Sequence, residues 1–245
     1  MLKYSLKFIL LSLIIIPIAG CGIKINNLSE AQQLYNKANE EYSKQNLQSA
    51  LSLYNESIKL DNKLELAYLN RGVVKEELKD HQGAIVDFTT VLTLNPNNSE
   101  AYNNIGLTYE SLKKYSEAVT NYDKAIKISP NDAKLYYNRA LVEHGLLSYE
   151  RALDDYNTAY NLGFNEPKLF YRRSLTYASM GEYKKAIDDL SQTISLENNN
   201  GKAYRYRGLI KLEIKEIEEG CRDLGIAAKL GDEEATLMEE KLCKN

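Results

Sequence analysis

The chain repeats itself every 34 residues from Ala31 onward, and no other feature of the sequence restricts the fold as strongly. Six copies follow one another without an insertion, at residues 31–64, 65–98, 99–132, 133–166, 167–200 and 201–234. Position 8 of the copies is always small: Ala38, Gly72, Gly106, Ala140, Ser174 and Gly208. Position 20 is small as well: Ala50, Ala84, Ala118, Ala152, Ala186 and Gly220. One structural unit is therefore used six times in succession.

Large side chains stand at other fixed positions of each copy. Position 24 is Tyr, Phe or Leu, position 4 is aromatic in all copies but the first, and position 30 is Leu or Ile. Small residues at positions 8 and 20 let two antiparallel helices approach closely, while the large residues fill the space up to the next pair. Asn, Asp, Pro and Gly around positions 31–34 end one hairpin and begin the next. The sequence predicts stacked helical hairpins.

This pattern closely resembles the tetratricopeptide repeat in its period, its small and aromatic positions, and Pro96 and Pro130 at position 32. The resemblance implies an all-α, right-handed solenoid of six helix-turn-helix hairpins over residues 31–234. Position 32 is not Pro in the other four copies, and Gly220 replaces Ala in the last copy. These departures affect the expected geometry of single turns and not the expected fold.

The first twenty residues have the composition of an export signal. Residues 1–20 carry Lys3 and Lys7 but no acid, and their apolar run is shorter than the about 20 residues that a membrane-spanning helix needs. The run ends in Ile-Ala-Gly followed by Cys21, which resembles the lipobox of bacterial lipoproteins. That resemblance implies removal of residues 1–20 and lipidation of Cys21. A plain cleaved signal or an uncleaved anchor is the alternative.

Residues 21–30 are expected to be the lipidated Cys and a short tether. Such a segment reaches at most about 30 Å, so the folded part would stay close to the membrane surface. Gly22 after the lipidated Cys is compatible with the outer membrane in enteric-type bacteria. We therefore expect a lipid-anchored protein of the cell envelope, at the outer membrane and facing the periplasm. Inner-membrane retention and exposure on the cell surface stay open.

Residues 235–245 are expected to form a capping helix, because a solenoid needs a terminal element with a polar outer face. Three apolar residues of this region, Leu237, Met238 and Leu242, lie on one side and acids on the other. The cap would fold back on the helix that carries Cys221. Outside the cytoplasm, Cys221 and Cys243 are then expected to form a disulfide. Two separate buried thiols are the alternative.

Composition and motifs argue against catalysis, metal binding and nucleic-acid binding. The formal charge of −3 lacks the basic excess of a nucleic-acid binder. Two His and three Cys leave little material for a metal site, and no GxSxG, HExxH or P-loop pattern is present. We expect a protein that is not an enzyme and uses no cofactor.

Charged residues at positions 7 and 23 vary together. The four copies with Arg at position 7 have Asp at position 23, which gives the pairs Arg71–Asp87, Arg139–Asp155, Arg173–Asp189 and Arg207–Asp223. The two copies without this Arg also lack the Asp. The pattern predicts a structural ion pair between the two helices of one repeat.

The resemblance to tetratricopeptide repeats implies that the first helix of each repeat lines a concave groove. The candidate groove residues are Tyr35, Asn36, Asn70, Asn104, Tyr137, Asn138, Lys168, Tyr171, Arg172, Lys202 and Arg205. Asn side chains can donate and accept hydrogen bonds toward an extended peptide, and Tyr supplies rigid contact area. The groove is mixed or acidic in the second and third repeats (Glu76, Glu100, Glu110) and basic in the last three.

The basic half of the groove predicts a partner segment with an acidic stretch that meets Lys168, Arg172, Lys202 and Arg205. Ordinary surface decoration of the repeats is the alternative interpretation. As a whole, the sequence predicts a membrane-anchored scaffold or adaptor that binds envelope proteins or extended peptide segments. A surface-exposed lipoprotein that binds host or environmental ligands is the second hypothesis, and self-association is left open.

Overall fold

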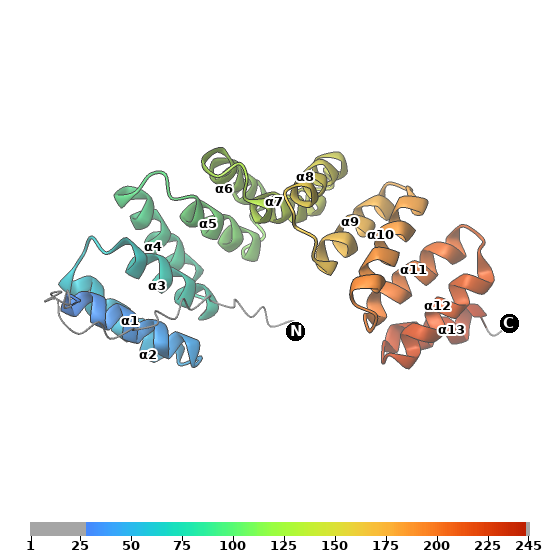
Figure 1. Ribbon diagram of the computed structural model, residues 1–245, viewed down its shortest axis with the longest axis horizontal. Coiled ribbons are helices and arrows are strands. Elements are labelled where there is room, and N and C mark those ends of the chain that lie inside the picture. Colours follow the sequence, from blue (N-terminus) through green and yellow to red (C-terminus); the bar gives the residue numbers. More distant parts are fainter. Residues whose placement is uncertain (1–27, 244–245) are drawn as a thin grey trace, which may run out of the picture.

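The computed structural model describes residues 28–243, which form an open arc of helices (Figure 1). This part of the chain contains thirteen α-helices and no strand. The helices are α1 (Glu30–Ser43), α2 (Leu47–Leu60), α3 (Glu65–Glu77), α4 (His81–Leu94), α5 (Ser99–Ser111), α6 (Tyr115–Ile128), α7 (Ala133–Gly145), α8 (Tyr149–Asn161), α9 (Pro167–Ser179), α10 (Tyr183–Leu196), α11 (Gly201–Glu213), α12 (Ile217–Lys229) and α13 (Glu233–Cys243). The predicted all-α solenoid is confirmed.

The predicted signal at residues 1–20 and the predicted lipidation of Cys21 lie outside the described residues, as does most of the tether at 21–30. Among the described helices, none is both long and apolar enough to cross a membrane.

Helices pair in the order of the sequence. In each of the six hairpins, from α1 with α2 to α11 with α12, the two helices pack against each other, and in the first five the second helix also packs on the first helix of the next hairpin. The last helix, α13, packs on α12. The core is therefore a series of small clusters, one at each junction, as in other proteins built from stacked repeats.

Small residues at positions 8 and 20 allow the close approach within each hairpin. A Cβ added at Gly72 would lie 2.5 Å from the ring of Phe88, and one at Gly106 would lie 2.7 Å from the ring of Tyr122. In the last hairpin, a Cβ added at Gly220 would lie 2.9 Å from the backbone oxygen of Gly208. Gly220 at position 20 therefore lets the two helix backbones of the last hairpin come into direct contact.

The turn within each hairpin uses the left-handed backbone conformation at position 15. Five of these residues carry a side chain: Gln45, Lys79, Lys113, Leu147 and Lys215, with φ between 59° and 70°. Gly occupies the position in the fifth repeat, as Gly181. The sequence gives little sign of this conformation, because Lys, Gln and Leu are not typical of it.

Candidate peptide-binding groove

The inner side of the arc is formed by the first helix of each repeat. Along the stack, α1 contacts α3, α3 contacts α5, α5 contacts α7, and α7 contacts α9. No second helix contacts the following second helix to a similar extent within the described residues. In a curved stack the elements on the inside lie closest together, so the first helices line the concave side (Figure 1).

Asn side chains on this inner wall join neighbouring repeats. The Asn70 amide donates to Tyr35 Oη at 3.1 Å and to Asn39 Oδ1 at 3.0 Å, and the Asn138 amide donates to Asn103 Oδ1 at 2.9 Å. Asn36 and Asn104 take part in hydrogen bonds within their own helices, to Gln32 and Asn103. The four predicted Asn residues of the groove therefore make hydrogen bonds within the inner wall. The repeat pattern does not predict Asn39 and Asn103 as hydrogen-bond partners of Asn70 and Asn138.

Two of the predicted groove tyrosines are half-buried and stay at the surface of the wall. The ring of Tyr35 packs against Tyr54, and that of Tyr171 packs edge-on against Tyr206 with 5.9 Å between the ring centroids. Tyr137 differs, because only 7% of it is exposed and its ring lies 4.8 Å from that of Phe164. Its assignment as a contact residue of the groove is corrected, since the ring belongs to the core of the fourth repeat.

Three of the four predicted basic groove residues remain on the surface. Arg172 is exposed and its guanidinium lies 6.0 Å from the ring centre of Tyr171, while Lys202 is exposed at the start of α11. Lys168 is half-buried, pairs with Glu166 at 2.7 Å, and lies over the ring of Phe164. These three side chains give the C-terminal half of the groove its positive charge.

Arg205 is a correction to the predicted groove. Its side chain is only 7% exposed, and it forms ion pairs of 2.9 Å with both Asp232 and Glu234. Asp232 also accepts a hydrogen bond from the backbone of Ala235 at 3.0 Å, in the first turn of α13. The charge of Arg205 is therefore used inside the chain, where it holds the start of the capping helix.

One polar cluster lies at the centre of the inner wall, on the first helices of the third, fourth and fifth repeats. We call Glu110, His144 and Arg172 the central cluster. Tyr122 Oη donates to Glu110 Oε2 at 3.4 Å, and His144 Nδ1 lies 3.0 Å from Thr176 Oγ1. Glu110 and Arg172 are both candidate groove residues in the sequence, but the repeat pattern does not bring them together with His144.

Burial and the charge of Arg172 set the ionisation of this cluster. Burial raises the pKa of Glu110, against the opposing effects of the Tyr122 hydrogen bond and Arg172. Burial also lowers the pKa of His144, and the positive charge of Arg172 lowers it further. Thr176 donates to the backbone oxygen of Arg172 at 3.2 Å, so the neutral imidazole donates from Nδ1 and keeps Nε2 as an acceptor. The cluster thus offers a cation, an acid and a neutral acceptor.

The predicted Arg–Asp pairs are confirmed in all four repeats. In the second repeat, Arg71 Nε and Nη2 donate to the two carboxylate oxygens of Asp87 at 2.8 and 2.6 Å. The other three pairs, Arg139–Asp155, Arg173–Asp189 and Arg207–Asp223, have the same two-pronged geometry.

The third nitrogen of each of these guanidinium groups has a role that the spacing of positions 7 and 23 does not predict. Nη1 donates to position 25 of the preceding repeat, which is Asn55, Asp123, Asn157 and Ser191 in turn. Each Arg therefore joins three helices.

A disulfide joins Cys221 of α12 to Cys243 at the end of α13, with 5.6 Å between the Cα atoms. This is the pair expected from the sequence. Together with the ion pairs of Arg205, it fixes both ends of the capping helix. No group of three or more His, Cys, Asp or Glu in residues 28–243 could hold a metal ion.

Comparison with known proteins identifies the repeats. Residues 66–98, 99–132 and 167–200 match family models of the tetratricopeptide repeat. No curated protein sequence matches the chain.

Solved structures share the fold. PilW, described as a widely conserved type IV pilus biogenesis factor, superposes with a TM-score of 0.76 at 18% identity, over 86% of this chain and 99% of its own. YrrB, a tetratricopeptide-repeat protein with an unusual peptide-binding site, superposes with a TM-score of 0.66 at 19% identity, over 77% and 98%. MamA superposes with a TM-score of 0.64 at 26% identity, over 70% and 94%. The chain therefore contains tetratricopeptide repeats, and its fold is that of a tetratricopeptide-repeat solenoid.

Proposed function

We propose that the protein is a membrane-anchored scaffold of the bacterial cell envelope whose concave groove binds extended segments of partner proteins. The proposed binding groove is supported by the inner wall, where the first helices present exposed Asn36, Arg172 and Lys202 beside half-buried tyrosines. Cations, amides and aromatic rings on one surface suit an extended chain, because its backbone donates and accepts hydrogen bonds along its whole length.

The anchor and the location rest on the sequence of residues 1–21, with its basic start, short apolar run and Ile-Ala-Gly before Cys21. Two or more acyl chains at Cys21 would give stable attachment to a membrane. Labelling cells with radioactive palmitate tests this part. The wild-type chain should take up label and Cys21→Ser should not. Label on both chains, or on neither, contradicts the anchor.

An acidic stretch in the partner is the finer part of the proposal. Arg172, Lys202 and Lys168 remain as the groove cations after Arg205 has been assigned to the cap. Exposed charges of this kind steer association and select partners more than they add affinity. The proposal therefore needs the positive half of the groove to discriminate between partners, and not only to attract them.

In-cell photo-crosslinking tests the groove. A photoreactive residue replaces Asn138 on the inner wall of the full chain, and a matched one replaces Lys184, an exposed residue of the second helix α10. We expect a discrete crosslinked protein from position 138 and none from position 184. The double variant Arg172→Glu/Lys202→Glu should lose that product, whereas Lys184→Glu should keep it. The same products from both positions, or their survival in the double variant, contradict the groove.

Proteolysis of intact cells separates the two locations left open by the sequence. A chain that faces the periplasm should resist an added protease until the outer membrane is opened. A chain that is cut in intact cells would instead be the surface-exposed lipoprotein of the second hypothesis.

A further inference from the structure

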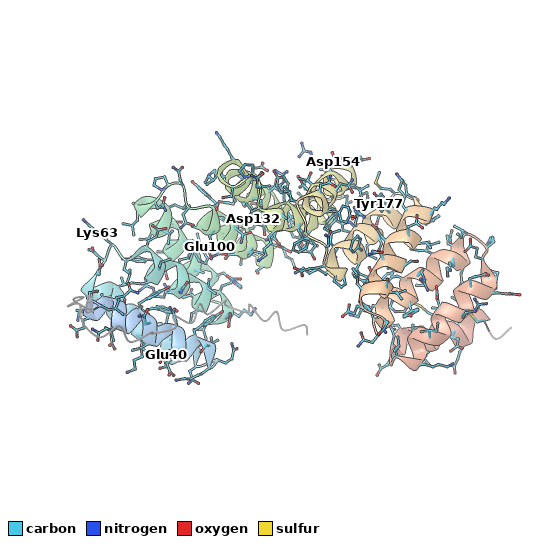
Figure 2. The ribbon with its side chains drawn as sticks, in the orientation of Figure 1. Glu40, Lys63, Glu100, Asp132, Asp154 and Tyr177 are labelled. Carbon is cyan, nitrogen blue, oxygen red and sulfur yellow. A yellow bond between two sulfur atoms is a disulfide. The ribbon has the colours of Figure 1, made fainter. Side chains whose placement is uncertain are left out.

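A second polar site lies where α6, α7 and α8 meet. A pocket of about 300 Å³ opens between these helices. It is lined by four carboxylates, Asp123, Glu143, Asp154 and Asp155, and by two guanidinium groups, Arg139 and Arg151. Figure 2 labels Asp154 on the outer edge of the arc, away from the concave side. The pocket is therefore separate from the groove of the proposed function.

Two of the three other repeats with this Arg–Asp pair place a lysine in the equivalent space, whereas the fifth repeat has Tyr177 there. In the second repeat, position 11 is Lys75, and its Nζ lies 2.8 Å from Asp87 Oδ2. In the last repeat, position 11 is Lys211, and its Nζ lies 2.9 Å from Asp223 Oδ2. Each Asp thus receives an ammonium group in addition to its Arg. In these two repeats a lysine of the chain itself helps to neutralise the carboxylate.

The fourth repeat keeps the Arg–Asp pair but has Glu143 at position 11. The lysine is replaced by a further acid, so Arg139 is the only cation paired with Asp155 within the described residues. With all groups ionised, the lining of this pocket carries two more negative than positive charges. A site that holds an ammonium group in two sister repeats is therefore acidic and open here.

Glu143 is an independent sign that a cation is missing. Its side chain is 5% exposed, and among residues 28–243 its one cationic contact is Arg151 Nη1, at a long 3.4 Å from Oε1. Arg151 is itself 77% exposed, so water weakens that pair. Glu143 lines the pocket, and its side chain is paired there only through this long contact within residues 28–243. A carboxylate this buried is stabilised by a closer cation.

We infer that this pocket binds a lysine side chain of a partner protein, with the ammonium group between Glu143 and Asp155. The position of that group follows Lys75 and Lys211, whose ammonium groups reach the equivalent Asp from inside their own repeats. The aliphatic stem would pack on Val119, the apolar residue of the lining. The solenoid would then bind a basic segment on its outer side and a segment with an acidic stretch in its groove.

A titration followed by nuclear magnetic resonance tests the pocket in the full, isotope-labelled chain held in detergent. The probe is the blocked peptide acetyl-Gly-Gly-Lys-Gly-Gly-amide, and its comparison peptide has norleucine in place of Lys. We expect the lysine peptide to shift the backbone amides of α7 and α8 near Glu143 and Asp155. The norleucine peptide, which keeps the stem but lacks the charge, should leave them unchanged.

Three variants make the test decisive. Glu143→Lys supplies the ammonium group from within, as in the second and last repeats, and should weaken the lysine peptide by about tenfold or more. Glu143→Gln keeps the shape of the side chain but removes its charge, and it should also weaken binding of the lysine peptide. The matched control Glu150→Lys changes the charge equally on an exposed residue of α8 and should keep binding.

Equal loss in Glu150→Lys, or shifts spread over all acidic surfaces, would overturn the lysine pocket and leave a general attraction of charges. Arg172→Glu in the groove should keep the lysine peptide bound. Failure of the pocket and failure of the groove are therefore distinguishable.

Discussion

Arg139 and Asp155 form a two-pronged ion pair, in which Nε and Nη2 donate to the two carboxylate oxygens at 2.8 and 2.7 Å. The remaining Nη1 donates to Asp123 in the preceding repeat at 2.5 Å. One guanidinium thus fixes the two helices of its own repeat and the second helix of the repeat before it. The pair recurs at four junctions, so it sets the register of the stack.

Breaking this pair from one side should destabilise the protein strongly. Asp155→Ala leaves a partly buried guanidinium without its main partner, and we expect a loss of about 3 kcal/mol in the free energy of unfolding. The double variant Arg139→Ala/Asp155→Ala should cost clearly less than the single variants Arg139→Ala and Asp155→Ala added together, because no buried charge is then left unpaired. Urea denaturation of the four proteins in the cycle measures the coupling. Additive losses would show that the pair is not coupled.

Gly220→Ala should destabilise the last hairpin by about 1–3 kcal/mol, since the new methyl group would meet the backbone of Gly208 at 2.9 Å. Backbone atoms cannot move aside as a flexible side chain can. The matched control is Gly225→Ala in the same helix, where an added Cβ meets only the tip of Glu239 at 3.3 Å. That change should be neutral or stabilise by up to about 1 kcal/mol through helix propensity. Equal destabilisation by the two changes would contradict the close approach.

The turn residue Leu147 offers a stabilising change. It has φ of 62° and is 69% exposed, so its side chain strains the backbone and gains little from packing. Leu147→Gly should raise the free energy of unfolding by about 0.5–1 kcal/mol. The reverse change in the fifth repeat, Gly181→Leu, should lower it by a similar amount. Thermal unfolding of both variants measures this, and a loss of stability in Leu147→Gly would contradict the strain.

The fold could be predicted from the sequence because its determinants recur. The Arg71–Asp87 spacing of 16 residues returns in three further repeats, and a pattern that varies in step reveals contact without a structure. The left-handed turn at Leu147 could not be predicted, since that side chain does not favour the conformation.

The two corrections in the groove share one cause. Position 5 contacts position 32 of its own repeat, so Tyr137 packs on Phe164 and Arg205 pairs with Asp232. In the sequence, position 32 is a turn position where Pro is usual, so the pattern does not connect it with the groove. Where position 32 carries a side chain that can pack or pair with position 5, the groove residue is drawn into the body of the repeat.

That contact predicts how the cap is held. Arg205→Met keeps the length of the side chain but leaves Asp232 buried beside no cation, and it should loosen α13 from the last repeat. Hydrogen exchange of the α13 amides should rise in this variant and in Cys221→Ser/Cys243→Ser, whose missing disulfide costs about 3 kcal/mol. Lys202→Met, a neighbouring change outside these contacts, is the control. Unchanged exchange in Arg205→Met would contradict its role in the cap.

The central cluster predicts a pH dependence of stability. Burial raises the pKa of Glu110, so above the ordinary value of 4.5 the folded chain holds this proton more firmly than the unfolded chain does. Stability then falls as the pH rises from 4.5 through the raised pKa, because the folded state must give up the proton there. Glu110→Gln cannot ionise at this position, so its free energy of unfolding should rise relative to that of the wild type across this window.

The difference between the two proteins should be constant below about pH 4.5, grow through the window and become constant again above it. His144 titrates in both proteins and so largely cancels in the difference. Tyr122→Phe supplies the second arm, since it removes a hydrogen bond that lowers the pKa of Glu110. The difference in free energy of unfolding between Tyr122→Phe and the double variant Tyr122→Phe/Glu110→Gln should therefore change over a window that lies at higher pH. A difference that does not change with pH would show that Glu110 is not held in a buried site.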